Sequence, residues 1–346
     1  MTMDSLLGIA VKHNASDLHI IADLKPYIRI DGHLKPLDKE SVLSAAKTKE
    51  LAYSVMSAEQ KKRFEEEKDL DFSYETSDES RFRINVHLEK GNVGLVARII
   101  NAEIPTLDEL SMPLIVHELL LEPQGLILLT GPTGSGKSTS LAAMIGTINK
   151  EKASHIVTLE DPIEYLHKAD KSIIIQRELG QDFLDFGSGL KHVLRQDPNV
   201  IMVGEMRDLE TIALALTLAE TGHLVLATLH TQDSAQTIDR IVDAFPPHQQ
   251  NQIRLQLSFV LKGVISQHLV DAVAGGRIAI REIMVSSPAI SNIIRENKIA
   301  QIKTAIQTSS DKGMFTLEQD LKRLVDDGVI TKEIAEIYSK YISFDD

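Results

Sequence analysis

The sequence predicts an α/β protein of two domains, the second of them built on a largely parallel sheet. At about 150 residues per domain, a chain of 346 residues has room for two. Apolar residues make up 43% of the chain and charged residues 25%, a balance typical of globular proteins. From about residue 114, short apolar runs alternate with helical patterns, which is typical of parallel strands covered by helices on both faces.

Residues 1–100 predict a small α+β domain. Helical patterns cover residues 4–13, 43–56 and 59–68, and extended patterns cover residues 17–21, 27–30, 82–88 and 93–99. Asp31 and Gly32 predict a hairpin turn after the second extended run. Residues 101–113 contain two prolines and no clear periodicity, so we expect them to form an interdomain linker.

Residues 114–346 predict the second domain. Buried strands are expected at residues 126–129, 156–159, 200–203 and 224–229. After about residue 275 the apolar residues keep helical spacing, so the C-terminal portion, 275–346, is expected to be mostly helical.

Composition argues against several classes of protein. The net charge is −13, only 4% of residues are aromatic and Trp is absent, which disfavours binding to nucleic acid. There is no cysteine, so disulfides, thiolate zinc sites and iron–sulfur clusters are excluded. We see no signal peptide and no apolar stretch near the ~20 residues that span a membrane, which favours a cytoplasmic protein.

Residues 131–139, which read GPTGSGKST, match the phosphate-binding loop G-x-x-x-x-G-K-[ST]. An apolar strand precedes the loop and an amphipathic helix follows it, which is the context that the motif requires. Such a loop wraps backbone N–H groups around phosphate oxygens, while Lys137 reaches the β- and γ-phosphates and Ser138 binds Mg²⁺. The expected nucleotide contacts are Gly131, Pro132, Thr133, Gly134, Ser135, Gly136, Lys137, Ser138 and Thr139.

Acidic residues follow two other predicted strands. Glu160 and Glu164 lie four residues apart around Pro162, and such a pair can orient a water molecule and accept its proton. The apolar run at 200–203 leads to Glu205, an arrangement in which the carboxylate holds Mg²⁺ directly or through water. A charged loop and an ordinary buried strand end are the alternative interpretations.

Histidines and arginines complete the candidate site. His223 and His230 flank the strand at 224–229, where an imidazole could contact the γ-phosphate or serve as a helix cap. Their spacing does not fit zinc. Arg83 and Arg98 lie on two strands predicted to pair, and arginine stabilises charge on a transferring phosphoryl group, although surface charge is the simpler interpretation.

Together these motifs resemble the secretion-type ring ATPases, most closely the ATPases that retract type IV pili. Matches to the family's Walker A, Asp box, Walker B and His box are GPTGSGKST at 131–139, VTLEDPIEY at 157–165, VIMVGEMRD at 200–208 and TGHLVLATLHT at 221–231. ASDLHI at 15–20 and YIRIDG at 27–32 match the family's small PAS-like domain. The similarity covers nearly the whole chain.

The resemblance implies a PAS-like α+β domain followed by a RecA-like P-loop ATPase domain with a helical C-terminal portion. It implies ATP and Mg²⁺ as ligands, Glu164 as the catalytic glutamate, Glu205 as the Walker B acid and His230 as a phosphate contact. Arg83 and Arg98 would act on a neighbouring subunit. The implied assembly is a homo-hexamer at the cytoplasmic base of the pilus machine. Its partners would be an inner-membrane platform protein and a paralogous retraction ATPase, without nucleic acid or zinc.

The branch of the family is predicted from two further features. Extension and type II secretion ATPases are longer at the N-terminus and usually carry a four-cysteine zinc motif, whereas this chain has no cysteine. Retraction ATPases carry a helix reading AIRNLIRE, matched at 289–296 with Ser291 in place of Arg and Ile293 in place of Leu. The alternatives are an accessory retraction ATPase, an extension ATPase, a RecA-like nucleic-acid translocase and a module that binds ATP without hydrolysing it.

Overall fold

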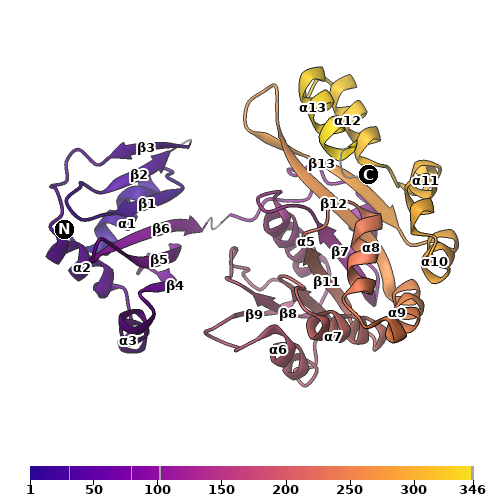
Figure 1. Cartoon of the computed structure of the whole chain (residues 1–346), viewed down its shortest axis with the longest axis horizontal. Coiled ribbons are helices and arrows are strands. Elements are labelled where there is room, and N and C mark those ends of the chain that lie inside the picture. Colours follow the sequence, from indigo (N-terminus) through magenta and orange to yellow (C-terminus); the bar gives the residue numbers. More distant parts are fainter. Residues whose placement is uncertain (31, 79, 101–102, 344–346) are drawn as a thin grey trace. The chain divides into compact units, whose positions relative to one another are not determined.

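The computed structural model describes residues 1–30, 32–78, 80–100 and 103–343. The chain divides into two compact units, unit 1 from Met1 to Glu103 and unit 2 from Ile104 to Asp346 (Figure 1). Residue 31 of the expected hairpin and residues 101–102 of the expected linker lie outside the described residues.

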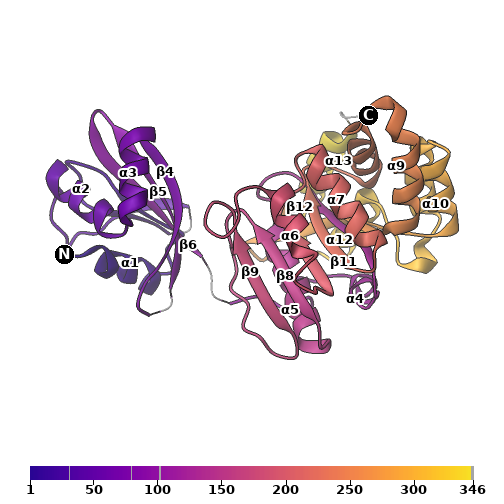
Figure 2. The same ribbon diagram turned by 90° about the horizontal axis from the view of Figure 1, so that it is seen from below.

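Unit 1 is an antiparallel sheet of six strands with three helices (Figure 2). The strand order is β3-β2-β1-β6-β5-β4. The strands are β1 Asp17–Ile20, β2 Tyr27–Ile30, β3 His33–Pro36, β4 Asp69–Glu75, β5 Arg81–Glu89 and β6 Asn92–Ile100, and the helices are α1 Met3–Lys12, α2 Ala45–Ser54 and α3 Ala58–Glu67. On β5, Phe82, Ile84 and Val86 are buried, and strand alternation therefore directs Arg83 to the opposite face.

Unit 2 is a seven-stranded sheet in the order β13-β12-β7-β11-β10-β8-β9, parallel except for β13. The strands are β7 Gly125–Thr130, β8 His155–Glu160, β9 Ile173–Glu178, β10 Val200–Val203, β11 Leu224–Leu229, β12 Leu261–Asp271 and β13 Arg277–Val285. The α-helices are α4 Leu114–Leu120, α5 Lys137–Glu151, α6 Phe186–Val193, α7 Leu209–Glu220, α8 Ser234–Asp243, α9 Pro247–Val260, α10 Pro288–Arg295, α11 Ile302–Gln307, α12 Leu317–Asp326 and α13 Lys332–Ser343. These two units confirm the expected α/β fold class.

Helices cover both faces of the sheet in unit 2, so alternate residues of its central strands enter different cores. On β7, Leu126 and Leu128 pack into a core shared with α6 to α9. Ile127 and Leu129 pack into the opposite core, shared with α4 and α5. Because both faces are covered, the strands are apolar throughout, which made them visible as continuous runs in the sequence.

The start of unit 2 corrects the expected linker at 101–113. Residues 104–113 belong to unit 2, and Leu107 and Met112 are buried in the core beneath α4 and α5. The two prolines remove helical periodicity without freeing the segment, because its apolar side chains are anchored.

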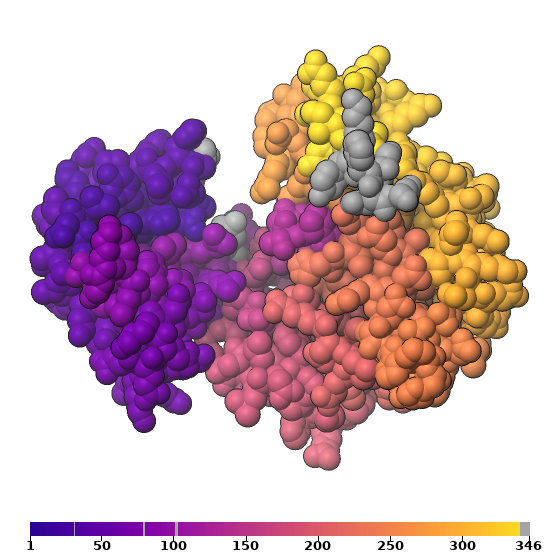
Figure 3. All heavy atoms as spheres, in the orientation of Figure 1, coloured from indigo at the N-terminus to yellow at the C-terminus, as the bar shows by residue number. Residues whose placement is uncertain are grey.

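The C-terminal portion also differs from expectation, since residues 277–285 form β13 and the helical part begins at Pro288. Two buried polar residues, Arg281 and Glu282, interrupt the apolar pattern of that strand and concealed it. In the helical part, α10 packs against α9 and α11 against α8, and these segments form a continuous surface (Figure 3). None of the described helices has the length and apolar character needed to cross a membrane.

Candidate active site

The loop at 131–139 joins β7 to α5 and is shaped by glycines. Gly131, Gly134 and Gly136 have φ values of 142°, 79° and 85°, a region that disfavours residues with a side chain. A Cβ on Gly131 would lie 2.1 Å from the backbone oxygen of Gln267 on β12, so there is no room for any other residue. The loop therefore exposes its N–H groups at the start of α5, where a helix favours an anion.

Two side chains of this loop fit a nucleotide phosphate. The Lys137 Nζ donates to the carbonyl oxygens of Gly131, at 2.7 Å, and Pro132, at 3.0 Å. Burial lowers the pKa of Lys137, opposed by the nearby carboxylates of Glu205 and Glu164. The Ser135 hydroxyl is buried and has no hydrogen-bond partner among the described residues. A phosphate group would supply the acceptor that this hydroxyl lacks.

Parallel pairing brings the His230 and Glu205 side chains to the same edge. Leu229 on β11 pairs with Thr130 on β7, so the residues that follow these strands are neighbours. The Nδ1 of His230 lies 3.5 Å from Lys137 Nζ, and its Nε2 lies 3.1 Å from Glu205 Oε1. His230 thus connects the phosphate-binding loop to the acid that follows β10.

The carboxylate of Glu205 is held in its charged form. Its Oε2 accepts a hydrogen bond from the Arg207 guanidinium at 2.8 Å. Partial burial would raise the pKa of Glu205, but Arg207 and His230 together outweigh it and hold that pKa below the ordinary value. An ionised carboxylate is the form that binds Mg²⁺.

Glu160, the last residue of β8, and Glu164, four residues later, have different surroundings. Glu160 is buried and accepts hydrogen bonds from Thr158 at 2.6 Å and Gln176 at 3.1 Å, and burial raises its pKa to about 6. Glu164 is exposed, and its charge acts on Lys137. The Tyr165 hydroxyl lies 2.9 Å from Thr139 Oγ1 and ties this turn to α5. Glu164 is therefore free to meet a water molecule, while Glu160 supports the turn.

The residues present fit a magnesium ion held partly by substrate. No group of three or more His, Cys, Asp or Glu side chains able to hold a metal occurs in the part of the chain that the structure describes. Mg²⁺ at phosphoryl-transfer sites typically takes one or two protein oxygens plus phosphate oxygens and water. Ser138, at the start of α5, and Glu205 supply that number.

His223 does not reach this site within the chain, and the structure corrects its expected role. It precedes Leu224, which pairs with Gly125 at the opposite end of β7 from the phosphate-binding loop. Its Nδ1 lies 2.9 Å from the Leu218 carbonyl at the end of α7. His223 therefore caps that helix, the alternative interpretation that the sequence left open.

The expected arginines are both in unit 1. Arg83 on β5 and Arg98 on β6 are directly opposite each other, as the predicted strand pairing required. Arg98 Nε donates to Asp17 Oδ1 at 3.0 Å, and Arg83 Nε lies 3.8 Å from Asp71 Oδ1. The side chain of Arg98 is 70% exposed and that of Arg83 is 43% exposed, so both guanidinium groups are accessible to a partner.

Sequence reasoning missed three residues of the site. Arg207, Tyr165 and Gln267 contact Glu205, Thr139 and the carbonyl of Ser135, respectively. Arg207 and Tyr165 each lie within a recognised motif, which was a usable signal. Gln267 gave none, because β12 is distant in sequence from every motif.

Comparison with known proteins identifies the family of the chain. The model of the family "Type II/IV secretion system protein" matches residues 1–275. The chain is 47% identical to the Type IV pilus retractation ATPase PilT of Pseudomonas aeruginosa over 98% of each chain. It is 40% identical to the Type IV pilus ATPase PilU of that organism, over 97% of this chain and 88% of that protein.

A solved structure extends the similarity to the fold. The crystal structure of the pilus retraction motor PilT with bound ADP has a TM-score of 0.92 and 46% sequence identity, covering 97% of this chain and 96% of that chain. These matches confirm the resemblance that the motifs indicated. The chain therefore belongs to the family of Type II/IV secretion system proteins.

Proposed function

We propose that this protein is an ATP-hydrolysing motor that drives type IV pilus retraction. The observation that carries the proposal is the cluster of Lys137, His230 and Glu205, joined by contacts of 3.5 and 3.1 Å beside the phosphate-binding loop. The 47% identity to a pilus retraction ATPase over nearly the full chain supports the choice of substrate and pilus role.

Residues of the site have separate roles in the proposed hydrolysis of ATP. Lys137 exchanges its contacts with the Gly131 and Pro132 carbonyls for the β- and γ-phosphate oxygens. Glu164 orients a water molecule whose oxygen attacks the γ-phosphorus, and the carboxylate accepts the proton of that water. The bond from the γ-phosphorus to the bridging oxygen breaks, leaving ADP and phosphate. Ser138 and Glu205 would hold a Mg²⁺ ion, which would neutralise charge on the phosphates.

The motor would work as a homo-hexamer in which Arg83 and Arg98 of one subunit approach the γ-phosphate of another. The pairing of Arg207 supports this arrangement. Arg207 lies at the site but its guanidinium is paired with Glu205, so the arginines for the γ-phosphate would come from unit 1 of another subunit. Both arginines of unit 1 are exposed on one face of its sheet. We place the ring at the cytoplasmic base of the pilus machine, with an inner-membrane platform protein and a paralogous retraction ATPase as partners.

The surface for the platform would include the outward face of α10. Ile290, Ile293 and Ile294 of this helix are buried, whereas Asn292 and Arg295 are exposed. Ser291, at the position of Arg in the family motif, donates to the Ser258 carbonyl at 2.9 Å and so packs against α9. The polar residues on the outward face of α10 are therefore Asn292 and Arg295, without Ser291.

Deleting the gene tests the proposed role. Loss of retraction should leave cells with excess surface pili and no twitching, and the purified protein should release phosphate from ATP. Bald cells would indicate an extension motor instead. Turnover that depends on added DNA would indicate a nucleic-acid translocase.

A variant of the outward face separates the motor from the ATPase. Replacing Asn292 and Arg295 by Ala should reduce twitching while phosphate release in solution stays near the parent rate. Equal loss of both would mean that α10 only supports the fold.

A further inference from the structure

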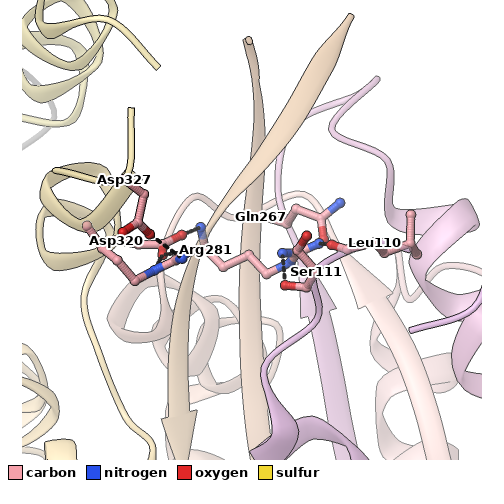
Figure 4. A network of polar contacts seen from close by, with 7 residues as sticks. Leu110, Ser111, Gln267, Arg281, Asp320 and Asp327 are labelled. Carbon is pink, nitrogen blue, oxygen red and sulfur yellow. Dashed lines mark hydrogen bonds and ion pairs between the residues drawn. The ribbon is translucent and has the colours of Figure 1, made fainter. Parts of the chain in front are cut away.

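A buried polar network leads from the phosphate-binding loop to the first segment of unit 2. Figure 4 shows the part of this network around Gln267 and Arg281. Gln267 on β12, 2% exposed, is its centre. Its Nε2 donates to the Ser135 carbonyl at 2.6 Å, and its Oε1 accepts from Ser140 Oγ at 3.0 Å. Ser135, in the loop, and Ser140, on α5, lie on either side of Lys137, so Gln267 contacts the chain both before and after that lysine.

The same Gln267 oxygen accepts a hydrogen bond from Arg281. Arg281 on β13 is 3% exposed, and its Nε lies 3.2 Å from Gln267 Oε1. Its Nη2 donates to the Leu110 carbonyl at 2.9 Å and its Nη1 to the Ser111 carbonyl at 3.1 Å. All three nitrogens of the guanidinium are engaged, Nε by Gln267 and the two Nη atoms by the carbonyls of residues 110–111.

The segment that Arg281 holds is the first part of unit 2. Unit 2 begins at Ile104, so residues 104–113 are the first of unit 2 after unit 1 ends. Ser111 has a φ of 48°, an uncommon conformation for a residue with a side chain. Its amide donates to Asp108 and that of Met112 to Leu107, both at 2.9 Å. The bonds from Arg281 hold this turn in a defined shape.

A second anchor fixes Arg281 from the opposite direction. Its backbone amide donates to Asp320 Oδ2 at 2.8 Å, and the carboxylate of Asp320, on α12, binds Arg323 at 2.8 Å. Burial lowers the pKa of Arg281 to about 10, so the guanidinium is still charged at neutral pH.

We propose that Gln267 and Arg281 are positioning residues that connect nucleotide binding at the P-loop to residues 104–113, the first segment of unit 2. This inference rests on the proposed ATPase function. When phosphate draws Lys137 away from the Gly131 and Pro132 carbonyls, the adjoining Ser135 carbonyl changes position. Because Gln267 is bonded to both Ser135 and Arg281, the change reaches the Leu110 and Ser111 carbonyls.

Hydrogen–deuterium exchange on the full-length protein with and without ADP tests the proposal. In the parent protein ADP should slow exchange of the Leu110, Ser111 and Met112 amides at least about threefold. Arg281→Lys keeps the charge but cannot form all three bonds, and it should lose this response while its Kd for ADP changes less than about threefold. Gln267→Leu should also lose the response, because it breaks the path before Arg281.

Arg323→Gln is the matched control, since Arg323 binds Asp320 on the far side of the network and should leave the response intact. Exchange of the β7 amides verifies folding of each variant. If Arg281→Lys does not fold, the exchange response of Gln267→Leu to ADP tests the inference alone. A parent protein that binds ADP without the response, or a folded variant that keeps it, overturns the inference. Failure of the parent protein to bind ADP would overturn the proposed function instead.

Discussion

The two units hold their charged residues in opposite ways. In unit 2, Lys137, His230 and Glu205 form a connected cluster at one edge of a sheet whose two faces are covered. In unit 1, Arg98 and Arg83 project from an open face with 70% and 43% of their side chains exposed. Groups proposed to bind phosphate in a fixed geometry are held by contacts with other side chains of the same unit. Groups available to a second molecule remain at the surface.

The exposed arginines are nevertheless ordered by strand register. Arg29, Asp17, Arg98 and Arg83 are successive cross-strand partners on β2, β1, β6 and β5, so they lie in one row. Asp17 is buried, and its carboxylate lies 3.0 Å from Arg98 Nε and 3.8 Å from Arg29 Nε. A single buried carboxylate therefore orients the neighbouring arginines of unit 1. In unit 2, by contrast, the charged side chains are oriented by a network of contacts.

The largest effect is expected in unit 2, from Lys137→Ala. The substitution removes the loop cation that faces the β- and γ-phosphates, so it should abolish ATP turnover and weaken ATP binding. Phosphate release and nucleotide titration measure both. Lys152→Ala, which removes a lysine bonded to the Glu122 carbonyl away from the loop, should retain activity. Turnover near the parent rate in Lys137→Ala would refute the site.

Glu164→Gln should keep ATP affinity and lower kcat by about 10²-fold or more, because the amide cannot accept the proton of water. Glu205→Gln should instead weaken the dependence of ATP binding on Mg²⁺. Parallel titrations of ATP and Mg²⁺ separate the two effects. If Glu205→Gln spares turnover and Glu164→Gln weakens binding alone, the roles are reversed.

In unit 1, Arg98→Ala and Arg83→Ala should each lower kcat, by up to about 10³-fold if the arginine stabilises the transferring phosphoryl group. ATP hydrolysis by the assembled protein is the measurement. Arg63→Ala is the control, because Arg63 is also an exposed arginine of unit 1 and pairs with Glu67 on α3. Equal activity of Arg98→Ala and Arg63→Ala would mean that these arginines are ordinary surface charge.

The smallest effect is expected from Asp17→Asn, which leaves Arg98 in place but removes the charge that orients it. We expect a loss of kcat of about tenfold, with ADP affinity unchanged, since a charge-assisted hydrogen bond becomes a weaker neutral one. Asp71→Asn, next to the exposed Arg83, should have less effect. If Asp17→Asn and Asp71→Asn have the same kcat, the buried carboxylate does not position Arg98.

The features that could be predicted from the sequence are those that depend on residues close together along the chain. The phosphate-binding loop needs glycines at fixed spacing, and the central strands need continuous apolar runs, so both could be recognised. The anchoring of residues 104–113 could not be predicted, because it depends on distant segments: Leu107 and Met112 pack into the core beneath α4 and α5, and Arg281 bonds to Ser111 across 170 residues. His223 and His230 flank the same strand, and the parallel pairing of that strand with β7 places only the end followed by His230 beside the loop.

Mixed assemblies test most directly the claim that each unit supplies half of one site. Arg98→Ala and Glu164→Gln subunits should each be nearly inactive alone. Mixing them places some intact Glu164 sites beside a subunit with intact Arg98, so a fraction of the activity should return. Light scattering must first establish that mixed rings form, and titration of Arg98→Ala into the parent protein measures how many competent sites turnover requires. If mixed rings form, no activity returns at any ratio, and activity in the titration falls only in proportion to the parent fraction, Arg98 acts within its own chain and the account is contradicted.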